Sequence, residues 1–438
     1  MQFQPHLRTY VRYTSLNVLG MLGLSCYILA DTFFVSKGLG SSGLAALNLA
    51  IPVYNFIHGT GLMLGIGGAT RFALAKGKND DEGSTVFTHT LLFGVCFAIL
   101  FLLLGLFGAA PLTSLLGADQ TVFEMTKTYL RVLLLFSPAF LLNDIMLCFV
   151  RNDGAPHLAM AAMVGGSLSN VVLDYVFIFP LQMGIFGAVF ATGLAPVISL
   201  MILSPFFLKK KNSFCPVRCR LNMPLSQRLL ACGLPSLVTE VSSGVVIMVF
   251  NMILLSLAGN TAVAAYGVVA NLSLVVIAIY TGIAQGIQPL VSRGCGLGDT
   301  DAVKTTLRYA VWTVAVFSVA LYAAVFFFAD GIAAVFNSGN DLQLQKIAVD
   351  GLRIYFIGCL SAGMNILLSS YFASSDSAKP ANLISLLRGL ILIVPLSFLL
   401  SWAGGITGLW AVFPTTETLV LCLAVWVYIH KQSKKKKT

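Results

Sequence analysis

Long apolar stretches dominate this sequence and leave few folds open to it. A helix needs about 20 mostly apolar residues to cross the hydrocarbon core of a bilayer. Backbone N–H and C=O groups in lipid must be paired within the protein, so such stretches form helices. The sequence therefore predicts an all-α membrane protein with twelve spans: residues 13–36, 43–75, 86–108, 126–150, 157–180, 184–208, 228–257, 262–292, 304–328, 345–373, 379–402 and 406–430.

The charge content fits a surface that faces lipid. Only 10% of the 438 residues are charged, whereas soluble domains carry about 25%. The net charge of +10 raises the question of a nucleic-acid partner. The basic residues are scattered among the loops and do not form one domain face, so we expect a lipid bilayer and no nucleic acid as partner.

The distribution of Lys and Arg predicts the orientation. With the N-terminus in the cytoplasm, 21 of the 27 Lys and Arg residues fall in cytoplasmic segments and five fall on the opposite side. Cytoplasmic loops carry such an excess, which predicts that both termini are cytoplasmic in a multi-pass protein of the plasma or inner membrane. The first apolar stretch is long, contains Asp31 and lacks a small-residue cleavage site, so we expect a span and not a signal peptide.

An internal repeat divides the chain into two similar halves. Three motifs recur in the same order at offsets of 219, 221 and 221 residues, which implies duplication. The pairs are Gly40-Ser-Ser-Gly-Leu-Ala-Ala46 with Gly259-Asn-Thr-Ala-Val-Ala-Ala265, Gly61-x-x-x-Gly65 with Gly282-x-x-x-Gly286, and Gly184-Ile-Phe-Gly187 with Gly405-Ile-Thr-Gly408.

The repeat predicts the symmetry of the molecule. We place an N-terminal six-helix lobe at residues 1–215 and a C-terminal six-helix lobe at 216–438, divided in the basic connection near the middle of the chain. Six is an even number, so both copies enter the membrane in the same orientation. This predicts a pseudo-two-fold axis along the membrane normal, a cavity between the lobes, and alternating access by rocking.

Polar residues in the first half share helix faces. Tyr27 and Asp31 are separated by one helical turn, as are Asn170 and Asp174, and Thr192 lies on the sixth span. If these faces converge, two carboxyl groups share one pocket and cannot both ionise cheaply, so the pair is predicted to take up a proton. The same oxygens suit Na⁺. A hydrogen-bonded helix clamp without a transport role is the alternative.

The second half contains fewer candidates. Glu240 lies in the middle of the seventh span, and Asn251 lies eleven residues later on the same face. Glu417 lies near the middle of the last span. Acids at membrane depth are expensive and usually functional, so we assign these residues to a substrate or cation cavity. The alternative for each acid is an uncoupled polar wall.

Two charged residues lie nearer the ends of their spans. For Arg388, snorkelling to the cytoplasmic surface is favoured over a role in the cavity. Asp144 is expected to reach the surface in the same way, beside Arg151.

Signatures of enzymes and metal sites are missing from the sequence. It has no Walker motif, HExxH motif or nucleophile elbow, so we expect neither an enzyme nor a cofactor. Most of the nine cysteines lie in apolar stretches, which implies no disulfide framework. Cys215 and Cys219 share a basic loop, but no His or second Cys pair completes a metal site.

Several motifs together resemble the multidrug and toxic compound extrusion (MATE) family. Their order over nearly the whole chain carries the resemblance, since no single motif is specific. The motifs are Asp31-Thr-Phe-Phe-Val-x-x-x-Leu-Gly40, Arg151-Asn-Asp-Gly-x-Pro156, Asn170-x-x-x-Asp174-Tyr-x-Phe-Ile-Phe, Gly184-Ile-x-Gly-Ala-x-x-Ala-Thr192, Pro235-x-x-x-x-Glu240, Ala258-Gly-x-x-x-Val-Ala-Ala-Tyr-Gly267 and Gly286-Ile-Gln-Pro289.

The resemblance implies an antiporter that exports lipophilic, often cationic compounds while H⁺ or Na⁺ flows inward. We expect the protein to act as a monomer. Asp31 matches the aspartate that takes the coupling ion in the branch that this chain most resembles. The polar network around that aspartate is matched by Tyr27, Asn170, Asp174 and Thr192.

The second half matches the family less completely. Glu240 matches an acid that some members use in the C-terminal lobe. The tenth span contributes Asn365 to the predicted substrate or cation cavity, but it offers no acid, unless Glu417 substitutes for one. No proline lies in the first span, where some members carry one.

Three other functions compete with this interpretation. A lipid-linked oligosaccharide flippase of the same superfamily would need cavity cations for pyrophosphate, and Arg388 is the one candidate. A channel would need a pore loop or a ring of charges. An intramembrane enzyme would need a nucleophile paired with a base at membrane depth.

Overall fold

The computed structural model describes residues 7–78, 82–337 and 341–435, and the regular structure of these residues is entirely helical. Eight of the described helices are long and apolar enough to cross a membrane, and α4 with α5 forms a ninth span that is bent by 48°. Three of the eight long helices are each divided by a glycine of positive φ into two spans, which adds three spans to these nine. The described residues therefore contain twelve spans in two lobes, which confirms the predicted fold class.

The helix bounds follow the predicted spans closely. The first half consists of α1 (Leu7–Gly77), α2 (Glu82–Phe107), α3 (Ala109–Leu115), α4 (Phe123–Leu135), α5 (Ser137–Asn152), α6 (Pro156–Ile178) and α7 (Gly184–Leu208). The second half consists of α8 (Met223–Leu297), α9 (Thr300–Phe336), α10 (Leu342–Tyr355), η1 (Phe356–Gly358), α11 (Cys359–Ser374), α12 (Ala378–Leu386), the π-helical turn η2 (Leu387–Ile391) and α13 (Ile393–Lys435).

Glycine backbones mark where one span turns into the next. Gly40 interrupts α1 with φ 68° and ψ −159°, and Gly259 interrupts α8 with φ 68° and ψ −157°. Gly184, which begins α7, and Gly405, which interrupts α13, also share positive φ, at 62° and 57°. This conformation is strained for any residue with a Cβ. The duplication seen in the sequence is therefore repeated in the backbone.

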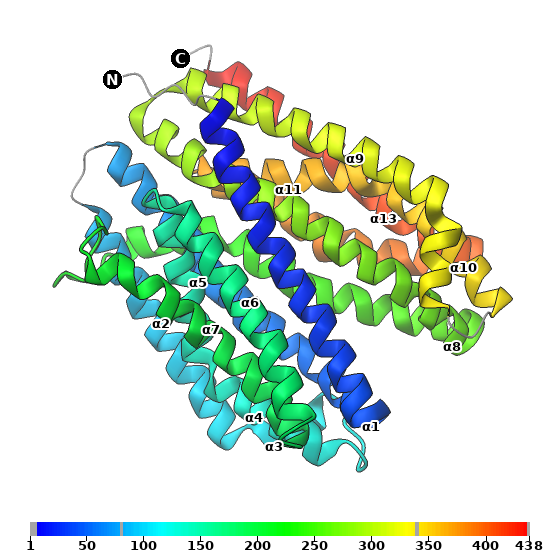
Figure 1. Cartoon of the computed structure of the whole chain (residues 1–438). Helices are drawn as coiled ribbons and strands as arrows, with labels where there is room; N and C mark the ends of the chain where they lie inside the picture. The colour runs from blue at the N-terminus through cyan, green and yellow to red at the C-terminus, as the bar shows by residue number, and fades with distance from the viewer. Residues whose placement is uncertain (1–6, 79–81, 338–340, 436–438) are drawn as a thin grey trace.

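The two lobes meet along α1 and α8, which pack against each other more extensively than any other helix pair. In Figure 1 the bundles lie close together near the end that carries both termini and diverge toward the other end. Polar contacts cross the interface near the terminal end. Arg71 forms an ion pair with Asp376 at 2.7 Å, and Gln288 donates to the hydroxyl of Thr70 at 2.9 Å.

Glycines allow the lobes to touch backbone to backbone. A Cβ added at Gly67 would lie 2.1 Å from the carbonyl oxygen of Leu229, and one added at Gly233 would lie 1.8 Å from that of Met63. No side chain fits at such distances. The glycine-rich part of the second span is thus a packing surface, as small residues in membrane helices usually are.

The connection between the lobes is not helical, but part of it is fixed. Phe214 is 1% exposed and packs edge-on or tilted against the rings of Phe72, Phe87 and Phe149 in the first lobe. The lobe boundary after residue 215 falls in this connection, and it stays a prediction.

Candidate functional site

A pair of carboxyl groups lies inside the first lobe. Asp31 in α1 is 6% exposed, Asp174 in α6 is fully buried, and the two side chains are in hydrogen-bond contact. One carboxyl oxygen of each has no hydrogen-bond partner among the described residues. No Lys, Arg or His of the described chain forms an ion pair with either. Two contacting carboxyl groups with no countercharge require a bound proton or cation.

The polar neighbours of this pair come from the faces that the sequence predicted. In the orientation that satisfies both ends of its side chain, Asn170 donates Nδ2–H to Asp174 Oδ2 at 3.0 Å. Its Oδ1 then accepts from the backbone N–H of Thr192 at 3.2 Å. The Thr192 hydroxyl donates to the carbonyl oxygen of Ala188 at 3.1 Å. Asn170 thereby ties α6 to α7 beside the carboxyl pair.

Tyr129 belongs to the same pocket, although the sequence did not single it out. It is buried on α4 and lies close enough to Thr192, Asp31 and Asp174 to interact with them. Its only sequence signal is a tyrosine within a membrane span. The chain contains 13 tyrosines, so that signal selects nothing by itself.

A chain of aromatic residues leads from the carboxyl pair toward the lobe interface. Tyr27, one turn before Asp31, shares a 2.6 Å hydrogen bond between hydroxyls with Tyr54. Tyr54 stacks on the ring of His58 at 5.8 Å between centroids. His58 Nδ1 lies 3.0 Å from Asp144 Oδ2. The polar residues of the first lobe thus extend well beyond the predicted set.

The expectation that Asp144 snorkels beside Arg151 is wrong. Asp144 is 5% exposed and pairs with His58. Arg151 is 2% exposed, and its Nη1 donates to Asn17 Oδ1 at 2.7 Å and to Gln285 Oε1 at 2.6 Å. Gln285 belongs to α8, so the guanidinium joins the two lobes.

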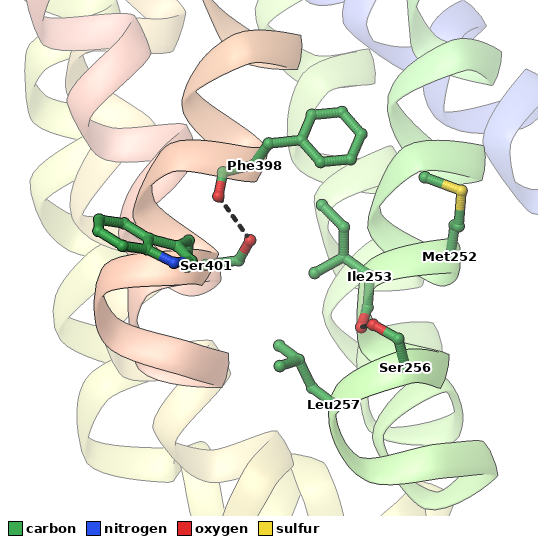
Figure 2. A pocket seen from close by; sticks show the side chains of 7 residues that line it. Met252, Ile253, Ser256, Leu257, Phe398 and Ser401 are labelled. Atoms are coloured by element: carbon green, nitrogen blue, oxygen red, sulfur yellow. Dashed lines mark hydrogen bonds between the residues drawn. The ribbon is translucent and has the colours of Figure 1, made fainter.

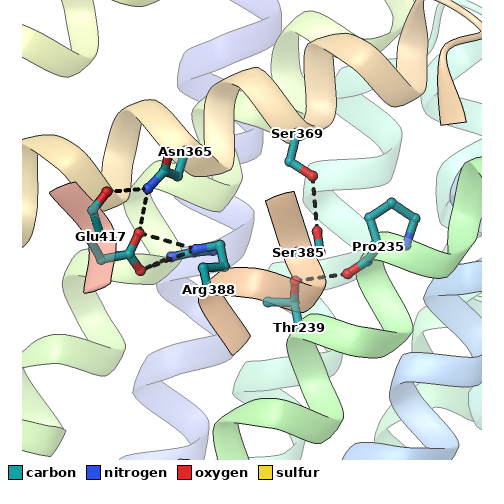
Figure 3. Close-up of polar contacts among 7 residues, drawn as sticks. All are labelled: Pro235, Thr239, Asn365, Ser369, Ser385, Arg388 and Glu417. Carbon is teal, nitrogen blue, oxygen red and sulfur yellow. Dashed lines mark hydrogen bonds and ion pairs between the residues drawn. The ribbon is translucent and has the colours of Figure 1, made fainter. Parts of the chain in front are cut away.

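The second lobe contains a buried ion pair between Arg388 and Glu417 (Figure 3). Arg388 Nη2 and Nε donate to Glu417 Oε1 at 2.7 and 3.1 Å, and Asn365 Nδ2 donates to Glu417 Oε2 at 2.7 Å. The side chains of Arg388 and Glu417 are 10% and 3% exposed. The prediction that Arg388 snorkels is therefore wrong: its side chain, which starts from the π-helical turn η2, pairs with Glu417 inside the lobe.

The four cavity residues predicted in the second half do not form one cluster. Glu417 and Asn365 form the ion-pair cluster with Arg388. Glu240 is half-buried and lies against Gly59 of the first lobe: a Cβ added to Gly59 would lie 3.0 Å from the Cβ of Glu240. Asn251 lies three turns further along α8 and is also half-buried.

An apolar groove opens beside Asn251, between α8 and α13 (Figure 2). It has a volume of about 320 Å³, and its lining includes Met252, Phe398 and Trp402. The two serines in the lining donate their hydroxyls to carbonyl oxygens of their own helices, at 2.7 and 3.1 Å. The groove therefore presents a mostly apolar surface.

The chain matches one family model and many related proteins. The family model described as MatE matches residues 18–176 and 235–399, a segment in each lobe. A relative named multidrug export protein MepA, from Staphylococcus saprophyticus, is 24% identical over 416 residues, which cover 94% of this chain and 91% of the relative.

Solved structures match over nearly the full length. One is a MOP superfamily transporter from Pyrococcus furiosus, with a TM-score of 0.90, 24% identity, and coverage of 98% of this chain and 96% of that one. Another is an outward-facing conformation of a multidrug resistance MATE family transporter, with the same TM-score, identity and coverage. At this identity the likeness concerns the fold.

Proposed function

Because the chain belongs to the MatE family, we propose that it is a secondary active multidrug efflux transporter that exchanges lipophilic, often cationic compounds for inward-moving H⁺ or Na⁺. The observation that carries the proposal is the buried Asp31–Asp174 pair, which has no countercharge within the described chain. The names of the relatives, which are multidrug export proteins, support the class of substrate.

The carboxyl pair would bind the coupling ion. With both groups ionised, two negative charges share a buried pocket, which is unfavourable in a low-dielectric environment. A proton shared by the pair, or a Na⁺ held by Asp31, Asp174 and Asn170, removes this repulsion. Tyr27 and Thr192 complete the polar surroundings. No cofactor takes part in this scheme.

The arrangement of the lobes suggests where the ion enters. The lobes are joined at the end that carries both termini and separated at the other end. If the excess of Lys and Arg places the termini in the cytoplasm, the structure faces outward. External ions would then reach the first lobe through the open side, and binding there would favour the change to the inward-facing state. We propose a location in the plasma or inner membrane.

The energy available fits an efflux pump. One positive charge that moves inward down 100 mV provides about 2.3 kcal/mol, which sustains a gradient of roughly fiftyfold for a neutral substrate, since each 1.4 kcal/mol is a factor of ten. For a monovalent cation exchanged one for one, the electrical terms cancel and the pH or Na⁺ gradient supplies the energy. Glu240 and Asn251 would face a cationic substrate near the interface, and we propose a monomer as the transporting unit.

The second lobe weighs against the flippase alternative. A pyrophosphate group would need an unpaired cation, but Arg388 is already neutralised by Glu417, which Asn365 also holds. The paired cluster itself would instead stay electrically neutral while the carboxyl pair of the first lobe changes its charge.

Reconstituted transport tests the proposal. Export of a fluorescent lipophilic cation from liposomes would be measured with an imposed pH gradient and, separately, an imposed Na⁺ gradient. We expect one gradient to drive transport in the wild type and not in Asp31→Asn. Asp301→Asn, at a side chain that is 92% exposed, is the matched control and should transport normally. Equal gradient-driven transport by Asp31→Asn would refute the role of the carboxyl pair.

A further inference from the structure

A second titratable cluster lies outside the Asp31–Asp174 pocket. His58, on the second span, holds Asp144 of α5 through its Nδ1 at 3.0 Å, and their side chains are 14% and 6% exposed. The imidazole also stacks on Tyr54 with an interplanar angle of 14°. The ring is thus fixed both by its face and by one nitrogen. A histidine held in this way can gain or lose a proton without rearranging the helices around it.

A carboxyl group from the other lobe faces the same histidine. Gly59 follows His58 in α1, and a Cβ built there would lie 3.0 Å from Glu240 Cβ and 3.3 Å from Leu237 Cα of α8. This contact leaves no room for a side chain between the lobes. Glu240 interacts electrostatically with both His58 and Asp144. The imidazole is thus paired with Asp144 of its own lobe, and Glu240 of the other lobe lies close enough for its charge to act on the same pair.

The other groups around the cluster do not provide a second countercharge. Tyr54 and Tyr27 use their hydroxyls on each other. Cys148 lies next to Asp144 on α5, and its sulfur accepts from Arg151 Nη2 at 3.4 Å. The Nη1 of that guanidinium is engaged by side chains of α1 and α8. His58 is thus the side chain whose charge decides the balance between the two acids.

We propose that His58, Asp144 and Glu240 form a second proton-binding site, which holds the two lobes together when His58 is protonated. The imidazolium then lies between an acid of each lobe and attracts both. When the proton leaves, two carboxylates from opposite lobes face each other without a cation, and they repel. The site lies at the contact between the lobes where Gly59 meets Glu240, so its charge acts on lobe separation. This inference rests on the proposed function in one respect: transport is what gives the separation of the lobes a functional role.

Direct titration of His58 tests the site without any substrate. The full-length protein, labelled with ¹³C and ¹⁵N histidine and placed in nanodiscs, has five histidines, and His58→Gln identifies the signal of interest. We expect the His58 signal to titrate at lower pH in Asp144→Asn and also in Glu240→Gln. Each variant removes a carboxylate that favours the imidazolium, and a shift of about one pH unit is a tenfold change in proton affinity. Asp301→Asn is the control. An unchanged titration in Glu240→Gln would overturn the proposal.

A distance measurement tests the consequence for the lobes. Spin labels on the open ends of the first and second lobes would report the separation as a function of pH. The wild type should show a pH-dependent change of the distance distribution, and His58→Gln should show none in the same range. If His58→Gln keeps the pH response, the site does not hold the lobes together. Asp31→Asn separates this proposal from the transport proposal, because it abolishes coupled transport and leaves the His58 titration in place.

Discussion

The buried ion pair of the second lobe gives the most quantitative prediction. Glu417→Gln keeps the size of the side chain but removes its charge, which leaves Arg388 as an uncompensated cation that is 10% exposed. Removing one partner of a buried pair typically destabilises a protein by about 3–5 kcal/mol. The bidentate contact with Arg388 would be lost, while the amide oxygen of the new side chain can still accept from Asn365. We therefore expect a loss near 3 kcal/mol.

The second step is to remove both charges. Arg388→Met combined with Glu417→Gln leaves no buried charge, and replacing a complete buried pair with apolar or neutral groups is often close to neutral. The double variant should therefore lose at least about 2 kcal/mol less than the sum of the single variants, whereas independent sites add within about 0.5 kcal/mol.

Reversible unfolding in mixed micelles with increasing SDS would give the free energies for this cycle. The exposed pair Lys304–Asp301, at 3.8 Å and 57% and 92% exposed, is the control, and its coupling should stay below about 1 kcal/mol. If the losses of unfolding free energy in the two single variants simply add up in the double variant, Arg388 and Glu417 do not act as one neutralised pair.

Three further predictions follow from other contacts. Gly233→Ala would place a Cβ 1.8 Å from a carbonyl oxygen of the other lobe, so the lobes should separate at the end that carries the termini, and cysteine labelling there should increase. The control Gly267→Ala adds a Cβ with nothing within 4 Å and should be labelled like the wild type. Asn170→Ala removes the hydrogen-bond donor to Asp174, so the apparent affinity of the transporter for the driving ion should change about tenfold. An unchanged affinity would mean that the amide only fills space. Hydrogen bonds from the Thr121 hydroxyl and from the backbone N–H groups of Thr121 and Val122 lower the pKa of Asp119. In a hydrogen-exchange measurement these two amides should therefore lose their protection only as the pH falls below about 4. Protection that does not respond to pH would contradict this.

Much of the fold follows from the sequence because it rests on local rules. The spans come from apolar length alone, and the repeat is visible because the turns between spans need glycine at Gly40, Gly259, Gly184 and Gly405. Helix identity and symmetry are therefore encoded within short segments.

The carboxyl pocket is also largely predictable. Asp31 and Asp174 stand out because acids are rare at membrane depth. Their partners Tyr27 and Asn170 follow from the four-residue spacing on one helix. The prediction could not add Tyr129, because its contact depends on how α4 packs against α7.

The contacts between distant spans could not be predicted. His58 and Asp144 are 86 residues apart, and Arg388 and Glu417 are 29 apart on two spans. Whether such side chains snorkel or pair depends on the rotation of each helix. In the case of Arg388, a π-helical turn changes that rotation, and no local sequence pattern reports it.

Ion release on substrate binding tests the central claim most directly. Purified protein in weakly buffered detergent solution, with a pH indicator and separately with a Na⁺-selective electrode, would be titrated with a fluorescent lipophilic cation. If Asp31 and Asp174 hold the coupling ion, the wild type should release about one H⁺ or Na⁺ for each substrate bound, and Asp31→Asn should bind substrate without that release. Substrate binding by the wild type with no ion released, or equal release by the variant, would contradict the account.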